Sequence, residues 1–195
     1  MKVIIIFLIF FLSSCAIKEL EPLKEYSLKE PTTVRKVNSS IYKNKILKVE
    51  IPLSISSEVG YKISYLYLKD NEGGYYINSQ YKEPLNLQLT KILINTLSKS
   101  NLFKSVVPYN SDIIEDLKLE STIFKIEHQI KNNNSSFAIF EIEVRLIDSN
   151  SKTILKSKRF RYTKECKTTN AQGFIEAFNE ILEQFSNDLI NWLRG

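Results

Sequence analysis

The stretch FAIFEIEVRLI, residues 137–147, alternates between two kinds of side chain along most of its length. Glu141, Glu143 and Arg145 occupy one set of alternate positions. The other set is apolar throughout: Ala138, Phe140, Ile142, Val144 and Leu146. A period of two residues predicts a β-strand with one buried face and one solvated face. The buried face needs a second layer to cover it, and the rest of the chain should supply that layer.

Further strands are expected on both sides of this stretch. Alternating apolar residues bounded by turn signals predict strands at residues 46–53, 61–68, 75–77, 106–107, 116–130 and 154–163. The turn signal Asp70-Asn71-Glu72-Gly73-Gly74 makes a hairpin of the second and third of these. Pro52 argues against a central position for the end of the first strand, because proline has no N–H to donate to a sheet ladder.

Two segments show the 3.6-residue period of an amphipathic helix. The first begins at Pro84, whose fixed φ suits a first helical turn, and ends near Ser100-Asn101. The second spans about Thr169 to Leu193, and Thr169 and Gln172 have the spacing of a capping box. Its apolar stripe is Phe174, Ala177, Phe178, Ile181, Phe185, Leu189 and Trp192. This order of elements predicts an α+β two-layer sandwich, with two amphipathic helices on a mixed or antiparallel sheet of about five to six strands.

The N-terminus has the features of a bacterial lipoprotein signal peptide over residues 1–14. Lys2 supplies a positive charge, and Val3 to Leu12 is an apolar run about half as long as the roughly 20 residues of a membrane-spanning helix. The lipobox Leu12-Ser13-Ser14-Cys15 follows. We therefore expect cleavage before Cys15 and attachment of diacylglycerol and an N-acyl chain such as palmitate to it. The other interpretation is an ordinary signal peptide, or an uncleaved anchor, with a chance cysteine.

The mature chain should consist of a lipidated N-terminus and tether, residues 15–44, and one folded domain, residues 45–195. If disordered, the tether would have an r.m.s. reach of roughly 30 Å. Part of it could pack instead, since Tyr26, Leu28 and the segment near Val34 could add a strand or lie over the core.

Charge and cysteine content exclude several kinds of function. The net charge is +5, and the basic residues are scattered among acids. Nucleic-acid binding is not expected, because an exported protein rarely meets nucleic acid. The densest basic stretch, residues 156–164, is typical of an edge strand protected by cations, or of a patch for anionic lipid. Cys166 has no partner left once Cys15 carries lipid; it is buried and inert, pairs between chains, or is a reactive thiol.

No catalytic or metal-binding constellation is evident. His128 is the only histidine and is expected at the surface of a strand or half-buried in it. One histidine and one spare cysteine do not make a metal site, and no phosphate-binding glycine loop occurs. The chain is therefore predicted not to be an enzyme and to need no cofactor beyond the lipid on Cys15. A hydrolase using His128, or a thiol enzyme using Cys166, is the weakest hypothesis.

Tyrosines are concentrated in the predicted hairpin and just after it: Tyr61, Tyr65, Tyr67, Tyr75, Tyr76 and Tyr81. Tyrosine is common both in strands and in interaction surfaces. Ordinary strand packing is one interpretation. The other is a partner surface, formed by Tyr75, Tyr76, Gln80, Tyr81 and Lys82.

Residues 26–193 resemble the ABC-type transport auxiliary lipoproteins. The resemblance lies in the strand KVEIPL (48–53), the segment YYINSQYKEP (75–84), the helix end LSKSNLFKSV (97–106) and the closing Asn191-Trp192-Leu193. In one position the chain departs from the family, which often has Trp where this chain has Tyr81 and Arg where it has Gln80. A partner contact at that position would therefore differ here.

The resemblance implies a non-enzymatic docking or adaptor component of an MCE-type intermembrane lipid transport system. Its partners would be an MCE-domain protein with its ABC permease and ATPase, the membrane through the lipid anchor, and further copies of the chain in a homo-oligomer. In the family, Asp after the lipidated cysteine retains the protein in the inner membrane, so Ala16 favours the periplasmic face of the outer membrane. The alternative is an assembly or structural lipoprotein, similar to a lipopolysaccharide-transport plug or a cell-wall synthase activator.

Overall fold

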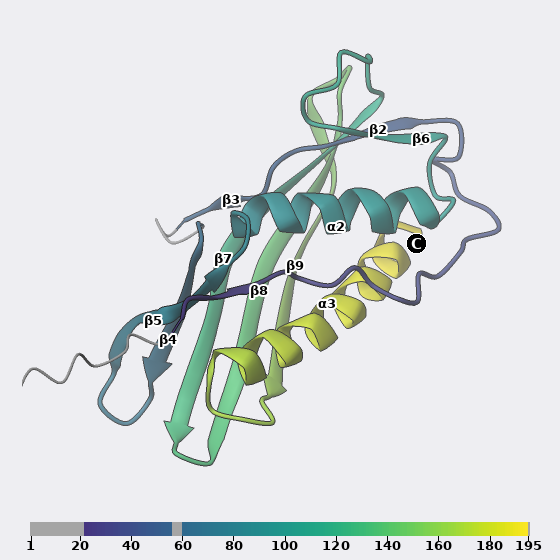
Figure 1. Ribbon diagram of the computed structural model, residues 1–195. Helices are drawn as coiled ribbons and strands as arrows, with labels where there is room; N and C mark the ends of the chain where they lie inside the picture. The colour runs from purple at the N-terminus through teal and green to yellow at the C-terminus, as the bar shows by residue number, and fades with distance from the viewer. Residues whose placement is uncertain (1–21, 56–59, 195) are drawn as a thin grey trace, which may run out of the picture.

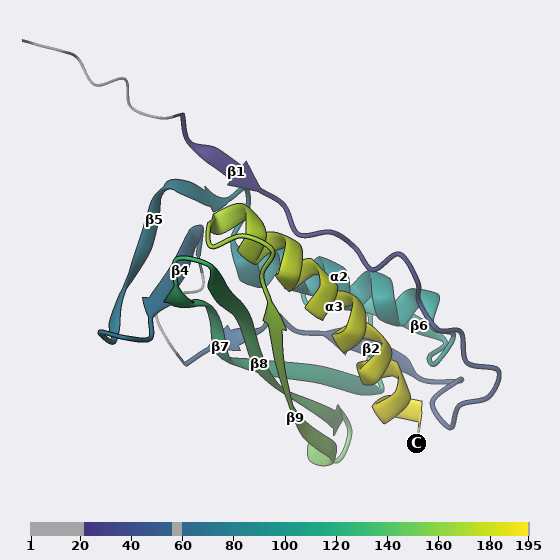
Figure 2. The ribbon, with the colours of Figure 1, turned by 90° about the horizontal axis from the view of Figure 1, so that it is seen from below.

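Nine strands form one mixed sheet in the described part of the chain, and two helices lie on the same face of it (Figure 1, Figure 2). The computed structural model describes residues 22–55 and 60–194. The strands are β1 (Lys24–Tyr26), β2 (Ile46–Val49), β3 (Leu53–Ser54), β4 (Lys62–Tyr67), β5 (Glu72–Tyr81), β6 (Ser105–Pro108), β7 (Leu117–Asn132), β8 (Ser135–Asp148) and β9 (Thr153–Glu165). The helices are α2 (Leu85–Lys99) and α3 (Ala171–Arg194). The α+β sandwich is confirmed, with more strands than expected.

The long strand β7 is the axis of the sheet. Along one edge it pairs antiparallel with β8, which pairs in turn with β9. Along its other edge it pairs in parallel with three short strands in succession, β2, β3 and β4. β6 extends the sheet beyond β2, and β5 and then β1 extend it beyond β4. Among the described strands β9 pairs with β8 alone, so the predicted edge position of the basic stretch is confirmed.

The predicted strand at 46–53 is broken into β2 and β3. Leu47 and Val49 are fully buried, as the alternation predicts, but Leu53 is 70% exposed. Proline has no N–H to donate, and Pro52 lies at the break between the two strands. β1 and β3 are only three and two residues long, and a period of two cannot be recognised over so short a stretch.

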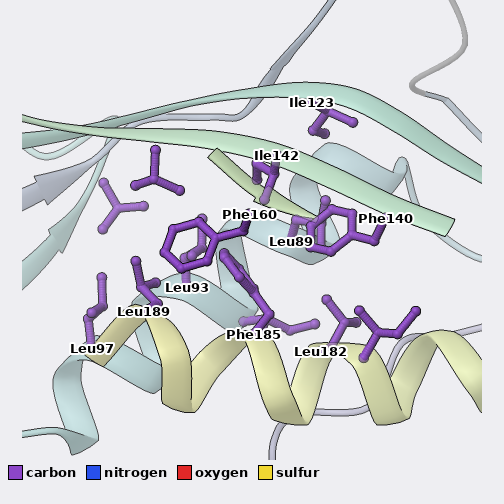
Figure 3. Packing of buried hydrophobic residues seen from close by; sticks show 14 of the residues in the cluster. Leu89, Leu93, Leu97, Ile123, Phe140, Ile142, Phe160, Leu182, Phe185 and Leu189 are labelled. Carbon is purple, nitrogen blue, oxygen red and sulfur yellow. The ribbon is translucent and has the colours of Figure 1, made fainter. Parts of the chain in front are cut away.

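The core lies between the sheet and the two helices. Figure 3 shows Phe140 and Phe160 of the sheet facing Phe185 of α3. Phe140 and Phe160 each meet the Phe185 ring edge-on, with 5.4 Å between ring centroids. The predicted stripe of α3 is buried except for its last member, Trp192, which is half-buried and meets Phe160 edge-on. No helix in the described part of the chain is long and apolar enough to cross a membrane.

A β-bulge at Phe124 changes which residues of β7 face the core. Before the bulge Ile123 lies opposite Ile142, and after it Ile126 lies opposite Phe140, so the inward positions change from odd to even numbers. His128 follows in the even series, opposite the buried Ala138, and is 0% exposed. The expectation of a surface or half-buried histidine is therefore wrong, because a one-residue bulge reverses the two faces of the strand beyond it.

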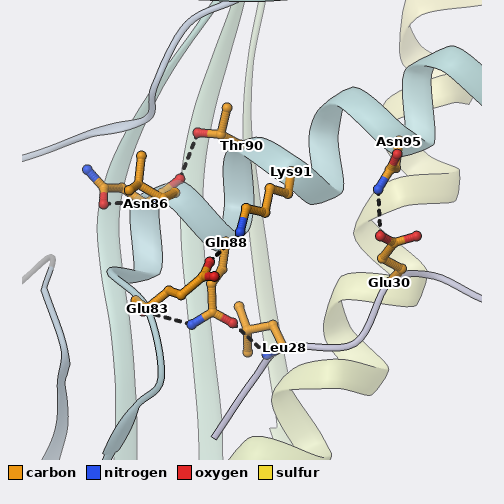
Figure 4. Close-up of polar contacts among 9 residues, drawn as sticks. Leu28, Glu30, Glu83, Asn86, Gln88, Thr90, Lys91 and Asn95 are labelled. Carbon is orange, nitrogen blue, oxygen red and sulfur yellow. Dashed lines mark hydrogen bonds and ion pairs between the residues drawn. The ribbon is translucent and has the colours of Figure 1, made fainter.

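Residues 24–37 are here called the N-terminal strap. The strap begins with β1 and then runs along both helices (Figure 2). Figure 4 shows two of its contacts with α2: Leu28 N–H donates to Gln88, and Asn95 donates to the Glu30 carboxylate. Further strap N–H groups donate to α3 or to the residue after α2: Lys29 to Asn179, Thr32 and Thr33 to Glu183, and Val37 to Ser100. Of the two behaviours considered for this segment, packing against the domain is the one observed.

The N-terminus of α3 is capped by Asn170. Its side-chain oxygen accepts a hydrogen bond from the N–H of Gly173 at 2.9 Å. The predicted capping box of Thr169 and Gln172 is wrong: the Thr169 hydroxyl donates to the carbonyl of Asn133, and the Gln172 side chain donates to Glu176. The helix therefore starts one residue later than the capping-box spacing indicated.

Asn170→Ala should lower the free energy of unfolding by about 1 kcal/mol, because it leaves an N–H of the first helical turn without its acceptor. Thr169→Ala is the matched control, one residue away. It should cost less, because a single exposed side-chain bond to a loop carbonyl is lost. Urea unfolding of the two variants measures the difference, and a larger loss in Thr169→Ala would contradict the assignment of the cap.

His128 should make stability depend on pH. Burial lowers the pKa of His128 from its ordinary value of 6.5 to about 4. Between these two values the unfolded chain binds a proton that the folded chain does not, so stability falls as the pH decreases through this window. The loss approaches roughly 3 kcal/mol at its lower end. Unfolding by urea at several pH values should show this contribution in the natural chain and not in His128→Asn; equal pH slopes would contradict it.

Candidate functional site

A groove of about 430 Å³ opens between the β4–β5 hairpin and the first turn of α3. Lys24 and Tyr26 of β1, Ile77 of β5 and Ile130 of β7 contribute to its walls. Its remaining aromatic lining consists of Tyr65, Tyr67, Tyr75 and Tyr76 from the hairpin. A second hollow of about 680 Å³ shares Tyr67 and Ile130 with the groove and reaches the β7–β8 turn. Both hollows therefore lie at the hairpin end of the sheet.

The tyrosines of the groove contact one another. The Tyr65 ring lies 5.4 Å from that of Tyr67 and 5.2 Å from that of Tyr76, between centroids. Gly74 makes room for Tyr65, since a Cβ at this position would come within 2.9 Å of the tyrosine hydroxyl. The hairpin sequence thus positions a set of packed rings that present both apolar area and hydroxyl groups.

Tyr76 joins this set to the core. Its hydroxyl and the Nδ1 atom of His128 form a hydrogen bond of 2.7 Å, and the His128 ring stacks between Tyr76 and Phe174. Among the described residues, His128 Nε2 has no hydrogen-bond partner. Burial raises the pKa of Tyr76, so the hydroxyl stays protonated. The pair anchors the floor of the groove, and a neutral, enclosed imidazole is poorly placed to act as a general base.

The five residues predicted to form a partner surface do not lie on one surface. Tyr75 and Lys82 are exposed, and Tyr76 points inward to His128. Gln80 is half-buried and donates to Glu25 on the neighbouring strand β1. Tyr81 is 1% exposed and belongs to the core cluster, because its side chain lies on the face of the sheet that the helices cover. The groove also includes Tyr26, Tyr65 and Tyr67, which were not among the five predicted residues. Tyr26 reaches the groove through the pairing of β1, and Tyr65 and Tyr67 reach it through the register of the hairpin.

Cys166 is buried just before α3. Its N–H donates to the carbonyl of Ser136, and burial raises the pKa of its thiol. The burial expected in one of the three interpretations is confirmed. A raised pKa lowers the thiolate fraction, which is the reactive form.

The cations of β9 are largely paired with acids or carbonyls. Arg159 and Arg161 both contact Glu141, at 2.5 and 2.6 Å, and the hydrogen bond from Arg161 lowers the pKa of that carboxyl. Lys164 pairs with Glu180, and Lys156 donates to carbonyls in the last turn of α3. This pairing favours the edge-strand interpretation of the basic stretch over a patch for anionic lipid.

The lipobox residues Leu12, Ser13 and Ser14 and the lipidation site Cys15 lie outside the described residues. Within the described ranges no three His, Cys, Asp or Glu side chains are grouped so that they could hold a metal ion. The groove is thus the site with the most distinctive geometry, and its chemistry is that of an interaction surface.

Two solved structures illustrate the likeness of this fold to known ones. Protein XCC0632 from Xanthomonas campestris is 18% identical, with a TM-score of 0.75 over 88% of this chain and 95% of that one. A PelC dodecamer from Paraburkholderia phytofirmans is 9% identical, with a TM-score of 0.51 over 84% of this chain and 97% of that one. At these identities the likeness concerns the fold alone. No curated protein matches.

One family model matches residues 26–189, which include every described strand from β2 on, α2 and most of α3. The match begins inside the N-terminal strap, at the last residue of β1. Membership in this family indicates a membrane-anchored lipoprotein of the periplasm that is associated with a transporter. The chain belongs to the family described as the ABC-type transport auxiliary lipoprotein component.

Proposed function

We propose that the protein is an outer-membrane lipoprotein that serves as a non-enzymatic docking module of an MCE-type intermembrane lipid transport system. The observation that carries the proposal is the family match over residues 26–189. In this system the chain would bind an MCE-domain protein, which an ABC permease and ATPase drive from the inner membrane. Cys15 would hold the module in the membrane through its diacylglycerol and N-acyl chains.

The described side chains support a docking role. The single histidine is buried and neutral at physiological pH, and the thiol of Cys166 is buried with a raised pKa. The groove is lined by tyrosines, which combine apolar area with a polar tip and suit a contact surface. Self-association is part of the proposal, with the PelC dodecamer as an example of a similar fold in an oligomer.

Crosslinking in intact cells, followed by purification through a C-terminal tag and mass spectrometry, tests the proposal. The expected result is recovery of an MCE-domain protein together with its ABC permease and ATPase. Recovery of an outer-membrane barrel or a cell-wall synthase, with no MCE-domain protein, would contradict it and support an assembly lipoprotein.

The variant Ala16→Asp tests the assignment to the outer membrane, and Ala16→Ser is its matched control. If the natural chain is sorted to the outer membrane, Ala16→Asp should shift it to the inner-membrane fraction, and Ala16→Ser should not. An inner-membrane location of the natural chain would contradict the outer-membrane part of the proposal while leaving the crosslinking result to decide the transporter part.

A further inference from the structure

The lipid anchor is separated from the folded domain by a short length of chain. Nine peptide steps lead from Cys15 to Lys24, which is hydrogen-bonded into the sheet opposite Ser79 of β5. Fully extended, nine residues span at most about 32 Å. As a flexible chain they have an r.m.s. length of about 17 Å, compared with roughly 30 Å for the whole segment 16–44. The strap therefore fixes which end of the domain lies near the anchor.

The end next to β1 exposes apolar and aromatic side chains. Ile77, two residues before the partner of Lys24, is 91% exposed, and Leu23 is 53% exposed. The hairpin adds Tyr61, Tyr67 and Leu68, which are 43–50% exposed. The same segments carry the exposed lysines Lys24, Lys62, Lys69 and Lys82, together with the exposed acids Glu25, Asp70 and Glu72. Lys62 also lies over the ring of Tyr75, 4.9 Å from its centroid.

We propose that this end of the sheet, formed by β1 and the β4–β5 hairpin, rests on the headgroup layer of the bilayer that holds the anchor. The placement rests on the proposed lipidation of Cys15. Tyrosine rings suit the boundary between headgroups and acyl chains, and lysines reach from such a surface to anionic headgroups. Ile77 is the side chain that enters the bilayer surface most deeply.

The length of the linker favours a membrane over a protein partner at this end. A compact domain of 100 residues has a radius of gyration of about 13 Å, which corresponds to a sphere about 34 Å across. Even the stretched linker of about 32 Å would not admit such a domain between bilayer and hairpin. The relaxed linker brings the hairpin into contact range of the headgroups.

The opposite end of the sheet offers a matched comparison. Ile114 is 89% exposed and lies two residues before Asp116, which precedes the first residue of β7. β7 begins at Leu117 and pairs with Tyr65 of β4 at His128. These two positions of β7 are eleven residues apart, which is about 36 Å along a strand. Ile77 and Ile114 are thus equally accessible isoleucines, and the proposal places only Ile77 at the membrane.

The test uses the full lipidated chain in phosphatidylcholine–phosphatidylglycerol vesicles that contain brominated acyl chains. Ile77→Cys and Ile114→Cys are each labelled with an environment-sensitive fluorophore. The unsubstituted chain, in which Cys166 is buried, gives the background of labelling. We expect several-fold stronger bromine quenching at position 77 than at position 114, with a blue-shifted emission at position 77 alone.

Three contrary results are distinguishable from one another. A chain that floats with the vesicles but shows equal, weak quenching at both positions would overturn the membrane placement and leave the anchor intact. A chain that does not float with the vesicles would overturn the anchor and, with it, the placement. Capture of a protein in place of lipid by a photocrosslinker at position 77 in intact cells would also overturn the placement.

Discussion

The pairing of β7 along both of its edges is the constraint on which the rest of the structure depends. One edge is bonded to β8 along nearly its whole length, and the other meets β2, β3 and β4 in turn. No other described strand connects the two halves of the sheet. The hairpin with its groove and the loop around Ile114 are therefore fixed at opposite ends of one rigid strand. Any function that distinguishes a membrane side from a periplasmic side can use this separation.

The bulge in β7 couples this frame to the groove. Before Phe124 the inward residues are Leu117, Leu119, Ser121 and Ile123, three of them apolar. Beyond it the inward positions bring His128 beneath Tyr76. From Tyr65 the rings are in contact through Tyr76 and His128 to Phe174 and Phe178 of α3. The tyrosines at the surface thus belong to the same packed layer as the core. A groove supported in this way keeps its shape, which suits a surface that positions the domain against a membrane or a partner.

Sequence patterns predicted the elements whose periodicity is long and regular. β8 and the apolar stripe of α3 are of this kind. The hairpin that precedes α2 was predicted from its alternating residues and its turn signal. The short strands β1 and β3 could not be predicted, because three and two residues carry no period. The packing of the N-terminal strap could not be predicted either, since the strap is held by separate hydrogen bonds to residues 55 to 156 positions away. Pro84, expected in the first turn of the first helix, lies one residue before it as the N-cap of α2, and the cap of α3 is Asn170 beside the predicted Thr169.

For the groove, the concentration of tyrosines in the hairpin was visible in the sequence, and their arrangement was not. A single bulge decides that His128 is buried, and the position of Tyr81 on the helix-covered face of β5 decides that it is buried too. The burial of neither residue can be recognised from the sequence around it. The predicted lipobox, in contrast, is a motif of four consecutive residues, and the lipidation proposed for it does not depend on the fold.

The central claim is that the folded domain begins at the strap, which leaves only a short chain between the anchor and the groove. Hydrogen–deuterium exchange of the lipidated protein on vesicles measures this directly. The account predicts slow exchange for the strap amides that donate hydrogen bonds, those of Leu28, Lys29, Thr32, Thr33 and Val37. Exchange of these amides at the rate of an unstructured chain would contradict it, because a free tether would let the domain stand away from the membrane in any orientation.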